Sequence, residues 1–253
     1  MTAYRIGAIA ALAISTLAAC QSAAGAPVQP EADPAAAVLS GGACPDMGEG
    51  GYIFWMGPRS AQPGETVTLY PYFTQMPGAY EELPAGCLGE VSVTPAGLAA
   101  LSRDAQGVAA VTVADDAPDG QTLRVSGAYP GGGSLAGRIE IYTAEAHPLV
   151  GTWHQESEGC PDESAVRELV FTAGGEFSVT WTPFETYTDY WGDYDYDPST
   201  GAVRLRVEGG NQVPPDIVAD GTATVGQGVL TFDALSFGTP DAASGTCQGG
   251  FRR

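Results

Sequence analysis

The sequence predicts an all-β protein in which a β-sandwich is followed by an eight-stranded, up-and-down antiparallel barrel. Three observations predict this fold class. Short apolar runs alternate with polar residues at a period of two, which is typical of strands with one buried face. The 253 residues include 35 glycines and 19 prolines, so turns are frequent and long helices are disfavoured. The hydrophobic and charged fractions, 44% and 16%, are those of a folded globular protein.

The charge balance excludes two classes of partner. The chain has 30 acidic residues against 10 basic ones, all of them arginine, and a formal net charge of −20. Binding to nucleic acid requires a basic face that neutralises phosphates, and this composition does not supply one. A polybasic membrane tether is excluded for the same reason.

The first 20 residues have the layout of a secretory signal peptide, with Arg5 before an apolar run over residues 6–14 and small residues after it. The tetrapeptide Leu17-Ala18-Ala19-Cys20 resembles the lipobox of bacterial lipoproteins. The resemblance implies a signal peptide over residues 1–19 and lipidation of Cys20, including palmitate. In such lipoproteins, an aspartate directly after the lipidated cysteine resembles a signal for retention in the inner membrane, and this chain has Gln21 there instead. The resemblance therefore also implies a lipid anchor in the outer membrane, facing the periplasm or the surface. The alternative is a soluble exported protein.

Residues 20–43 comprise the lipidated cysteine and a segment of Ala, Pro, Gln and Gly with few large apolar side chains. Such a composition does not form a core, so we expect a flexible stalk.

Four cysteines remain after Cys20, an even number in a chain predicted to be exported, so we expect disulfides. Three pairings are possible. We favour Cys44–Cys87 and Cys160–Cys247, because this choice keeps each bridge inside one of the two predicted domains.

Residues 44–146 are predicted to form the sandwich. The expected strands are residues 52–56, 66–73, 90–94, 107–114, 121–129 and 135–143. The turn sequences Pro63-Gly64-Glu65 and Ala117-Pro118-Asp119-Gly120 precede strands and look like those of bacterial immunoglobulin-like repeat domains. The resemblance implies an immunoglobulin-like sandwich. Cys44 precedes the first strand, so its bridge differs from the usual inter-sheet disulfide.

Residues 147–253 are predicted to form the barrel. The expected strands are residues 149–156, 166–172, 176–182, 187–196, 202–208, 221–225, 229–232 and 246–252. The segment Asp197-Pro198-Ser199-Thr200-Gly201 has strong turn chemistry.

This turn sets a register for the hairpin. If Asp197 pairs with Ala202, then Asp195 faces Arg204 and Asp193 faces Arg206 on one face of the hairpin. Tyr194 and Tyr196 then face Leu205 and Val203 on the other face. A single register therefore pairs opposite charges on one face of the hairpin and apolar side chains on the other.

The first barrel strand opens with Gly151-Thr152-Trp153, which resembles the Gly-x-Trp signature of lipocalins and related calycin barrels. The resemblance implies that Trp153 closes one end of the barrel beneath an arginine from the last strand. Arg252 matches that arginine by position and is expected to make a cation–π contact.

Three aspartates have the spacing of a calcium loop: Asp193, Asp195 and Asp197. Pro198 stands where the loop needs glycine and Arg204 where it needs glutamate, so an EF-hand is excluded. We expect an acidic strand face paired with arginines. A looser metal site using Asp189, Asp193 or Asp195 is the weaker alternative.

Aromatic residues are concentrated in the barrel sequence. They are candidates for a ligand mouth, with a packed core as the alternative. The ligand-binding candidates are Phe171, Phe177, Trp181, Tyr190, Trp191 and Tyr194. Trp191 shares a strand face with Asp193 and Asp195, so it is an exposed aromatic residue if that face is external.

No catalytic motif is found, so no catalytic residue and no cofactor are assigned. The first hypothesis is a non-catalytic envelope lipoprotein whose barrel binds a small apolar or amphipathic ligand. The alternative is a protein-interaction module, or a protease-inhibitor-like barrel with a packed interior, and an enzyme with an unrecognised carboxylate site ranks third. The expected partners are the membrane, through the lipid anchor, and a small apolar ligand or an envelope protein.

Overall fold

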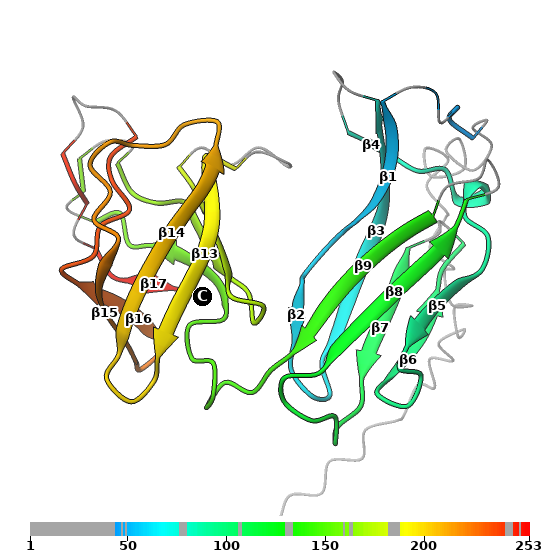
Figure 1. Ribbon diagram of the computed structural model, residues 1–253, viewed down its shortest axis with the longest axis horizontal. Helices are drawn as coiled ribbons and strands as arrows, with labels where there is room; N and C mark the ends of the chain where they lie inside the picture. The colour runs from blue at the N-terminus through cyan, green and yellow to red at the C-terminus, as the bar shows by residue number, and fades with distance from the viewer. Residues whose placement is uncertain are drawn as a thin grey trace, which may run out of the picture. The chain divides into compact units, whose positions relative to one another are not determined.

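A computed structural model describes residues 44–46, 48, 50–75, 80–105, 108–129, 134–158, 160–161, 164–181, 188–240, 245–247 and 249–253. The secondary structure of these residues is almost entirely β, with one short 3-10 helix, η1 (Ala85–Cys87). The strands form two open sheets in the first half of the chain and one closed barrel in the second half (Figure 1). The predicted fold class is therefore confirmed.

The two open sheets face each other as a sandwich. The first has the order β1-β3-β7-β6, with β4 paired to β3, and the second has the order β2-β9-β8-β5. The bounds are β1 (Gly51–Met56), β2 (Ser60–Ala61), β3 (Thr66–Gln75), β4 (Glu81–Glu82), β5 (Val91–Thr94), β6 (Ala99–Arg103), β7 (Ala109–Val113), β8 (Thr122–Ala128) and β9 (Ser134–Ile141).

The core of the sandwich follows the period-two pattern of its sequence. Val67 and Val111 from the first sheet pack in one apolar cluster with Leu123 and Ile139 from the second. All four side chains are at most 2% exposed. These inward side chains alternate with outward polar residues along each strand, and their burial between the two sheets holds the sheets together.

Three strands were not predicted: β2, β4 and β6. Two of them have only two residues each. The third, β6, has the sequence Ala-Ala-Leu-Ser-Arg, which has no β-branched residue and little alternation. Pairing with β7 over Ala99–Arg103, rather than local propensity, holds it in the sheet.

The second half of the chain is an eight-stranded barrel in which every strand pairs antiparallel with the next and β17 pairs with β10. Figure 1 shows β13 and β14 at the front of this barrel. The bounds are β10 (Gly151–Gln155), β11 (Glu168–Phe171), β12 (Glu176–Thr180), β13 (Tyr190–Asp197), β14 (Ala202–Gly210), β15 (Asp220–Gly226), β16 (Val229–Asp233) and β17 (Phe251–Arg252).

The predicted register of the β13–β14 hairpin is confirmed, from Asp197 opposite Ala202 to Asp193 opposite Arg206. Of the two expected opposite ion pairs, Arg206–Asp193 is present at 3.9 Å, whereas Arg204 does not pair with Asp195. Arg204 reaches Asp220 on β15 at 2.6 Å, and Arg206 pairs diagonally with Asp195. Arg204 thus pairs with the residue opposite it on β15 instead of the one on β13, and Arg206 reaches the diagonal position because its side chain is long.

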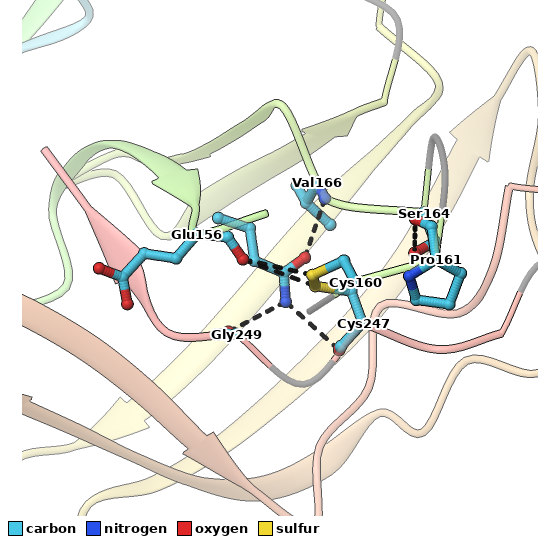
Figure 2. Close-up of a disulfide and its surroundings, with 8 residues drawn as sticks. Glu156, Cys160, Pro161, Ser164, Val166, Cys247 and Gly249 are labelled. Carbon is cyan, nitrogen blue, oxygen red and sulfur yellow. Dashed lines mark hydrogen bonds between the residues drawn. A yellow bond between two sulfur atoms is a disulfide. The ribbon is translucent and has the colours of Figure 1, made fainter. Parts of the chain in front are cut away.

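Both predicted disulfides are present, Cys44–Cys87 and Cys160–Cys247. Cys160 follows β10 and Cys247 precedes β17, so the second bridge lies beside the seam where the barrel closes (Figure 2).

A side-chain amide that was not anticipated from the sequence strengthens this seam. The Nε2 of Gln155 donates to the carbonyl oxygens of Gly249 at 3.0 Å and Cys247 at 3.4 Å, and its Oε1 accepts from the backbone N–H of Val166 at 2.9 Å (Figure 2). One side chain on β10 therefore ties the approaches to β11 and β17 together.

The predicted signal peptide, the lipidation site Cys20 and the stalk over residues 20–43 lie outside the described residues. Within the described part of the chain, no helix is long and apolar enough to span a membrane.

Candidate functional site

The interior of the barrel holds five of the six aromatic ligand-binding candidates, all except Trp191, and Tyr194 is the one of the five that is only partly buried. Phe171, Phe177, Trp181 and Tyr190 are each at most 4% exposed and belong to one apolar cluster. Their rings contact one another in a chain, with centroids 6.5 Å apart for Phe171 and Phe177, 6.0 Å for Phe177 and Tyr190, and 5.8 Å for Tyr190 and Trp181. These side chains fill the interior by packing against each other.

The tyrosine hydroxyls of the interior are bonded to the barrel itself. The Tyr190 hydroxyl donates to the carbonyl oxygen of Phe237 at 2.8 Å, and the Tyr194 hydroxyl donates to that of Thr172 at 2.9 Å. Burial raises the pKa of both tyrosines above its usual value of 10.0, so both remain neutral at physiological pH. Because the hydroxyls already have internal partners, they are not free to orient a ligand.

A small hollow lies at one end of the barrel. Its volume is about 120 Å³, and its lining includes Phe232, Leu235, Phe237 and Phe251. Pockets that bind drug-sized molecules usually have about 300–1,000 Å³. The hollow therefore has room for water or a small fragment only.

Trp153 is buried in the barrel core, and the arginine over it is Arg253 and not the predicted Arg252. The guanidinium carbon of Arg253 lies 4.4 Å from the indole centroid. The indole Nε1 donates to the carbonyl oxygen of Leu149 at 2.7 Å. A Cβ at Gly151 would lie 3.1 Å from Nε of Arg253, so this close approach favours the glycine.

The error over Arg252 comes from the strand register. His154, not Trp153, pairs with Arg252, which places Arg252 on the outside, where its Nε lies 2.5 Å from Oε1 of Glu156. A shift of one residue moves a side chain to the other face of a sheet, and the cysteine positions do not fix register to one residue.

Trp191 is the one ligand-binding candidate on the outer face of the barrel. Its side chain is 43% exposed. It pairs with Ser178 of β12 on one side and with Gly209 of β14 on the other. A Cβ at Gly209 would lie 3.2 Å from the indole, so the ring lies over the glycine backbone. The bare backbone of Gly209 therefore supports a broad apolar side chain at the surface.

The surroundings of Trp191 are acidic. Asp193 and Asp195 follow it on the same strand face, and exposed Glu208 lies across on β14. Arg206 partly offsets this charge, because it pairs with Asp195 and lies 3.9 Å from Asp193. We call Trp191, Ser178, Gly209, Asp193 and Glu208 the Trp191 surface.

Asp189, one of the weak metal candidates, does not join this acidic face. It is 3% exposed, and its Oδ2 accepts a 2.7 Å hydrogen bond from the backbone N–H of Trp181. Among the described residues, no group of three or more His, Cys, Asp and Glu side chains lies in a metal-binding arrangement. The three aspartates are thus divided between a backbone contact and ion pairs.

Gly192 fixes the position of the Trp191 surface, and Gly192→Ala is expected to lower the free energy of unfolding by about 2–3 kcal/mol. The strand register shifts between Trp191 and Gly192. A Cβ at Gly192 would lie 1.9 Å from the carbonyl oxygen of Arg206, so β13 and β14 must separate.

Urea unfolding followed by circular dichroism measures this effect. The matched control is Gly226→Ala on β15, where a Cβ meets nothing within 4 Å, and its change is expected to stay within about 1 kcal/mol. Equal effects of the two variants would contradict the close approach at Gly192.

The chain matches no protein-family model, and its sequence matches none of the curated proteins.

Proposed function

We propose that this protein is a non-catalytic, lipid-anchored envelope protein whose barrel is a packed protein-interaction module, with the Trp191 surface as its contact site. The observation that supports the contact site is the exposed indole on Gly209 in an otherwise charged strand face. Tryptophan is the residue type most enriched at the energetic centres of protein interfaces.

The packed interior favours interaction over ligand storage. The rings of Phe171, Phe177 and Tyr190 occupy the space that a ligand requires, and the hollow at the barrel end has about 120 Å³. A small eight-stranded barrel whose interior is filled by side chains is a rigid scaffold. Its outer strands and loops are then the surfaces that meet a partner.

The charge around Trp191 indicates the chemistry of the partner. Asp193 and Glu208 border the indole, and the chain as a whole has a formal net charge of −20. A partner surface with an apolar recess for the indole and basic residues at its rim complements this arrangement. An anionic membrane surface is repelled by it.

The proposal includes the resemblances to a lipoprotein signal, an immunoglobulin-like domain and a lipocalin-like barrel. The lipobox ending at Cys20 supports the lipid anchor and the outer-membrane location. The sheet orders β1-β3-β7-β6 and β9-β8-β5 correspond to strands ABED and GFC of an immunoglobulin sandwich, which supports an immunoglobulin-like first domain. The closed eight-stranded barrel that opens with Gly151 and Trp153 supports a lipocalin-like second domain.

A photo-crosslinking amino acid placed at Trp191 is expected to form an adduct with an envelope protein in living cells. The same amino acid at Thr224, an exposed position on β15, is the matched control and is expected to form none. Once the partner is purified, Trp191→Ala is expected to weaken its affinity at least tenfold, because central tryptophans contribute about 2 kcal/mol or more. Equal adduct yields at the two positions, or an unchanged affinity, would exclude the Trp191 surface as the contact site.

Cys20 is expected to carry the lipid. Cells grown with an alkyne fatty acid should label the wild-type protein, and Cys20→Ser should abolish the label, because the thiol that receives the acyl chain is lost. Cys44→Ser is the matched control and should keep the label. Labelling that persists in Cys20→Ser would refute the lipid anchor at this position.

A further inference from the structure

The outer face of the β1-β3-β7-β6 sheet is uncharged in a strongly acidic protein. Its inner face, with Val67, Leu69 and Val111, packs into the sandwich core, so the alternate residues of each strand point outward. The outward positions with exposed or partly exposed side chains, all uncharged, are Tyr52, Phe54 and Met56 on β1; Thr66, Thr68, Tyr70 and Tyr72 on β3; Ala110 and Thr112 on β7; and Ala100 and Ser102 on β6.

One end of this face is a cluster of aromatic rings. Phe54 and Tyr72 are opposite each other in the register and are stacked, with centroids 6.0 Å apart. Tyr52 and Tyr80 flank Phe54, with centroids at 5.6 and 5.3 Å. Both flanking tyrosines remain about 40% exposed, at 42% and 39%. We call Tyr52, Phe54, Tyr72 and Tyr80 the aromatic platform.

The hydroxyls of the platform and its edge are polar groups within reach of a ligand. Burial and a hydrogen bond to Tyr80 raise the pKa of Tyr52 above its usual value, so its hydroxyl stays protonated. Glu82 on β4 lies opposite Tyr72 and is exposed, so one carboxylate borders the rings. β4 lies beside β3 at this end of the sheet (Figure 1).

The other end of the face has small side chains and hydroxyl groups. Thr66 and Thr112 are opposite each other and share a 2.9 Å hydrogen bond. Ala100 and Ser102 continue the face onto β6 as exposed small residues. From Tyr72 to Thr66 this face extends six residues along β3. At about 3.4 Å per residue this is roughly 20 Å, long enough for several sugar units.

This combination distinguishes among possible partners. Nucleic acids and anionic lipids need basic groups, and the outward positions have none. A second copy of the chain would bring its own carboxylates against Glu82 and the acidic surroundings. A neutral sugar chain has apolar C–H faces that pack on aromatic rings, and hydroxyls that bond to tyrosine, threonine and carboxylate oxygens.

We propose that the outer face of the β1-β3-β7-β6 sheet binds a neutral polysaccharide, with the aromatic platform as its stacking site. This site is separate from the Trp191 surface and is tested independently of it. The polymer runs along β3 from the platform toward the threonines, so binding needs several consecutive sugar units and free monosaccharides bind weakly.

Native gel electrophoresis of the full chain in mild detergent, with a neutral polysaccharide in the gel, tests the proposal. Hydroxyethyl cellulose and galactomannan are suitable neutral probes, and alginate is the anionic comparison. The wild-type protein is expected to be slowed by at least one neutral polysaccharide and not by alginate. The double variant Tyr52→Ala/Tyr80→Ala should raise the dissociation constant at least tenfold.

Val213→Ala is the matched control, since it removes an apolar side chain of similar exposure, 46%, from the barrel, and this variant should bind polysaccharide as the wild type does. Circular dichroism shows whether the double variant remains folded. If the double alanine variant unfolds, the variant Tyr52→Phe/Tyr80→Phe replaces it in the test. This variant keeps both rings, so its dissociation constant is expected to rise less than tenfold over that of the wild type, and a larger rise would contradict stacking on the rings. The proposal is overturned if neither neutral polysaccharide slows the wild type, if the folded double variant binds equally well, or if sedimentation shows that the face holds a second copy.

Discussion

Phe171→Ala is expected to lower the free energy of unfolding of the barrel by about 3–5 kcal/mol, as for other large-to-small changes at fully buried aromatic positions. Phe171 lies at the centre of the aromatic core. Its ring centroid is 4.8 Å from that of Tyr194, 6.4 Å from that of Phe232 and 6.5 Å from that of Phe177. Because neighbouring rings are held by their own contacts, they cannot collapse into the space left by the phenyl group.

Val170→Ala is the matched control for this prediction. Val170 is the preceding residue of β11 and points to the opposite, partly exposed face, so its truncation should cost about 1 kcal/mol or less. Urea unfolding of the two variants measures the difference. A cost below about 1.5 kcal/mol for Phe171→Ala would contradict a tightly packed interior.

The same variant should acquire a binding property that the wild type lacks. A cavity lined by apolar rings stays dry and accepts small apolar molecules. Benzene is therefore expected to raise the midpoint of thermal unfolding of Phe171→Ala and to leave that of the wild type unchanged. Equal stabilisation of both proteins would indicate an existing cavity.

The double variant Cys160→Ala/Cys247→Ala is expected to lower the free energy of unfolding of the barrel by about 4.5 kcal/mol. The bridged residues are 87 positions apart, and releasing a loop of this length returns that much chain entropy to the unfolded state in the loop-closure description. The backbone pairing at the seam is short: β17 has two residues, and among the described residues it pairs with β10 at His154–Arg252 and Gln155–Phe251, with one more hydrogen bond from the Glu156 N–H to the carbonyl oxygen of Gly250 at 2.8 Å.

Hydrogen exchange followed by mass spectrometry locates this effect. Amides of β10 and β17 should exchange on the order of a thousandfold faster in the variant, while those of β3 and β7 keep their protection. Cys44→Ala/Cys87→Ala, which opens the other bridge, should give the reverse pattern. Unchanged exchange at the seam would mean that the Gln155 hydrogen bonds alone hold the barrel closed.

The eight barrel strands could be predicted because alternation and turn chemistry agree there. The turn from Asp197 to Gly201 fixed one end of the β13–β14 hairpin, and a single register then matched charges on one face and apolar residues on the other. The disulfide pairing followed from the domain division. Where two signals coincide, a sequence specifies register as well as strand order.

Other features depend on contacts that a sequence pattern does not contain. Alternation places Asp189 on the face of Trp191, but Asp189 precedes β13, and a hydrogen bond to the backbone of Trp181 buries it. The arginine over Trp153 depends on a one-residue register at the seam. The hydrogen bonds of Gln155 could not be predicted either, because they depend on the pairing of β10 with β17.

The strands that form the uncharged outer sheet face could be predicted in part from the sequence, but the face itself could not. The residues around Tyr52 and Tyr70 alternate between core and surface in a pattern that predicts strands. The missing information was the pairing of β3 with β7 and of β7 with β6, which brings the threonines, Ala100 and Ser102 onto one surface with the tyrosines. Non-local pairing of this kind leaves no local signal.

Native mass spectrometry of the protein purified from its own envelope tests the packed barrel most directly. The account predicts a mass equal to that of the processed, lipidated chain, alone or with a protein partner, and no small molecule retained in the barrel. A small molecule bound in one-to-one ratio would contradict it, provided that Leu205→Trp, which fills the interior further, abolishes the binding.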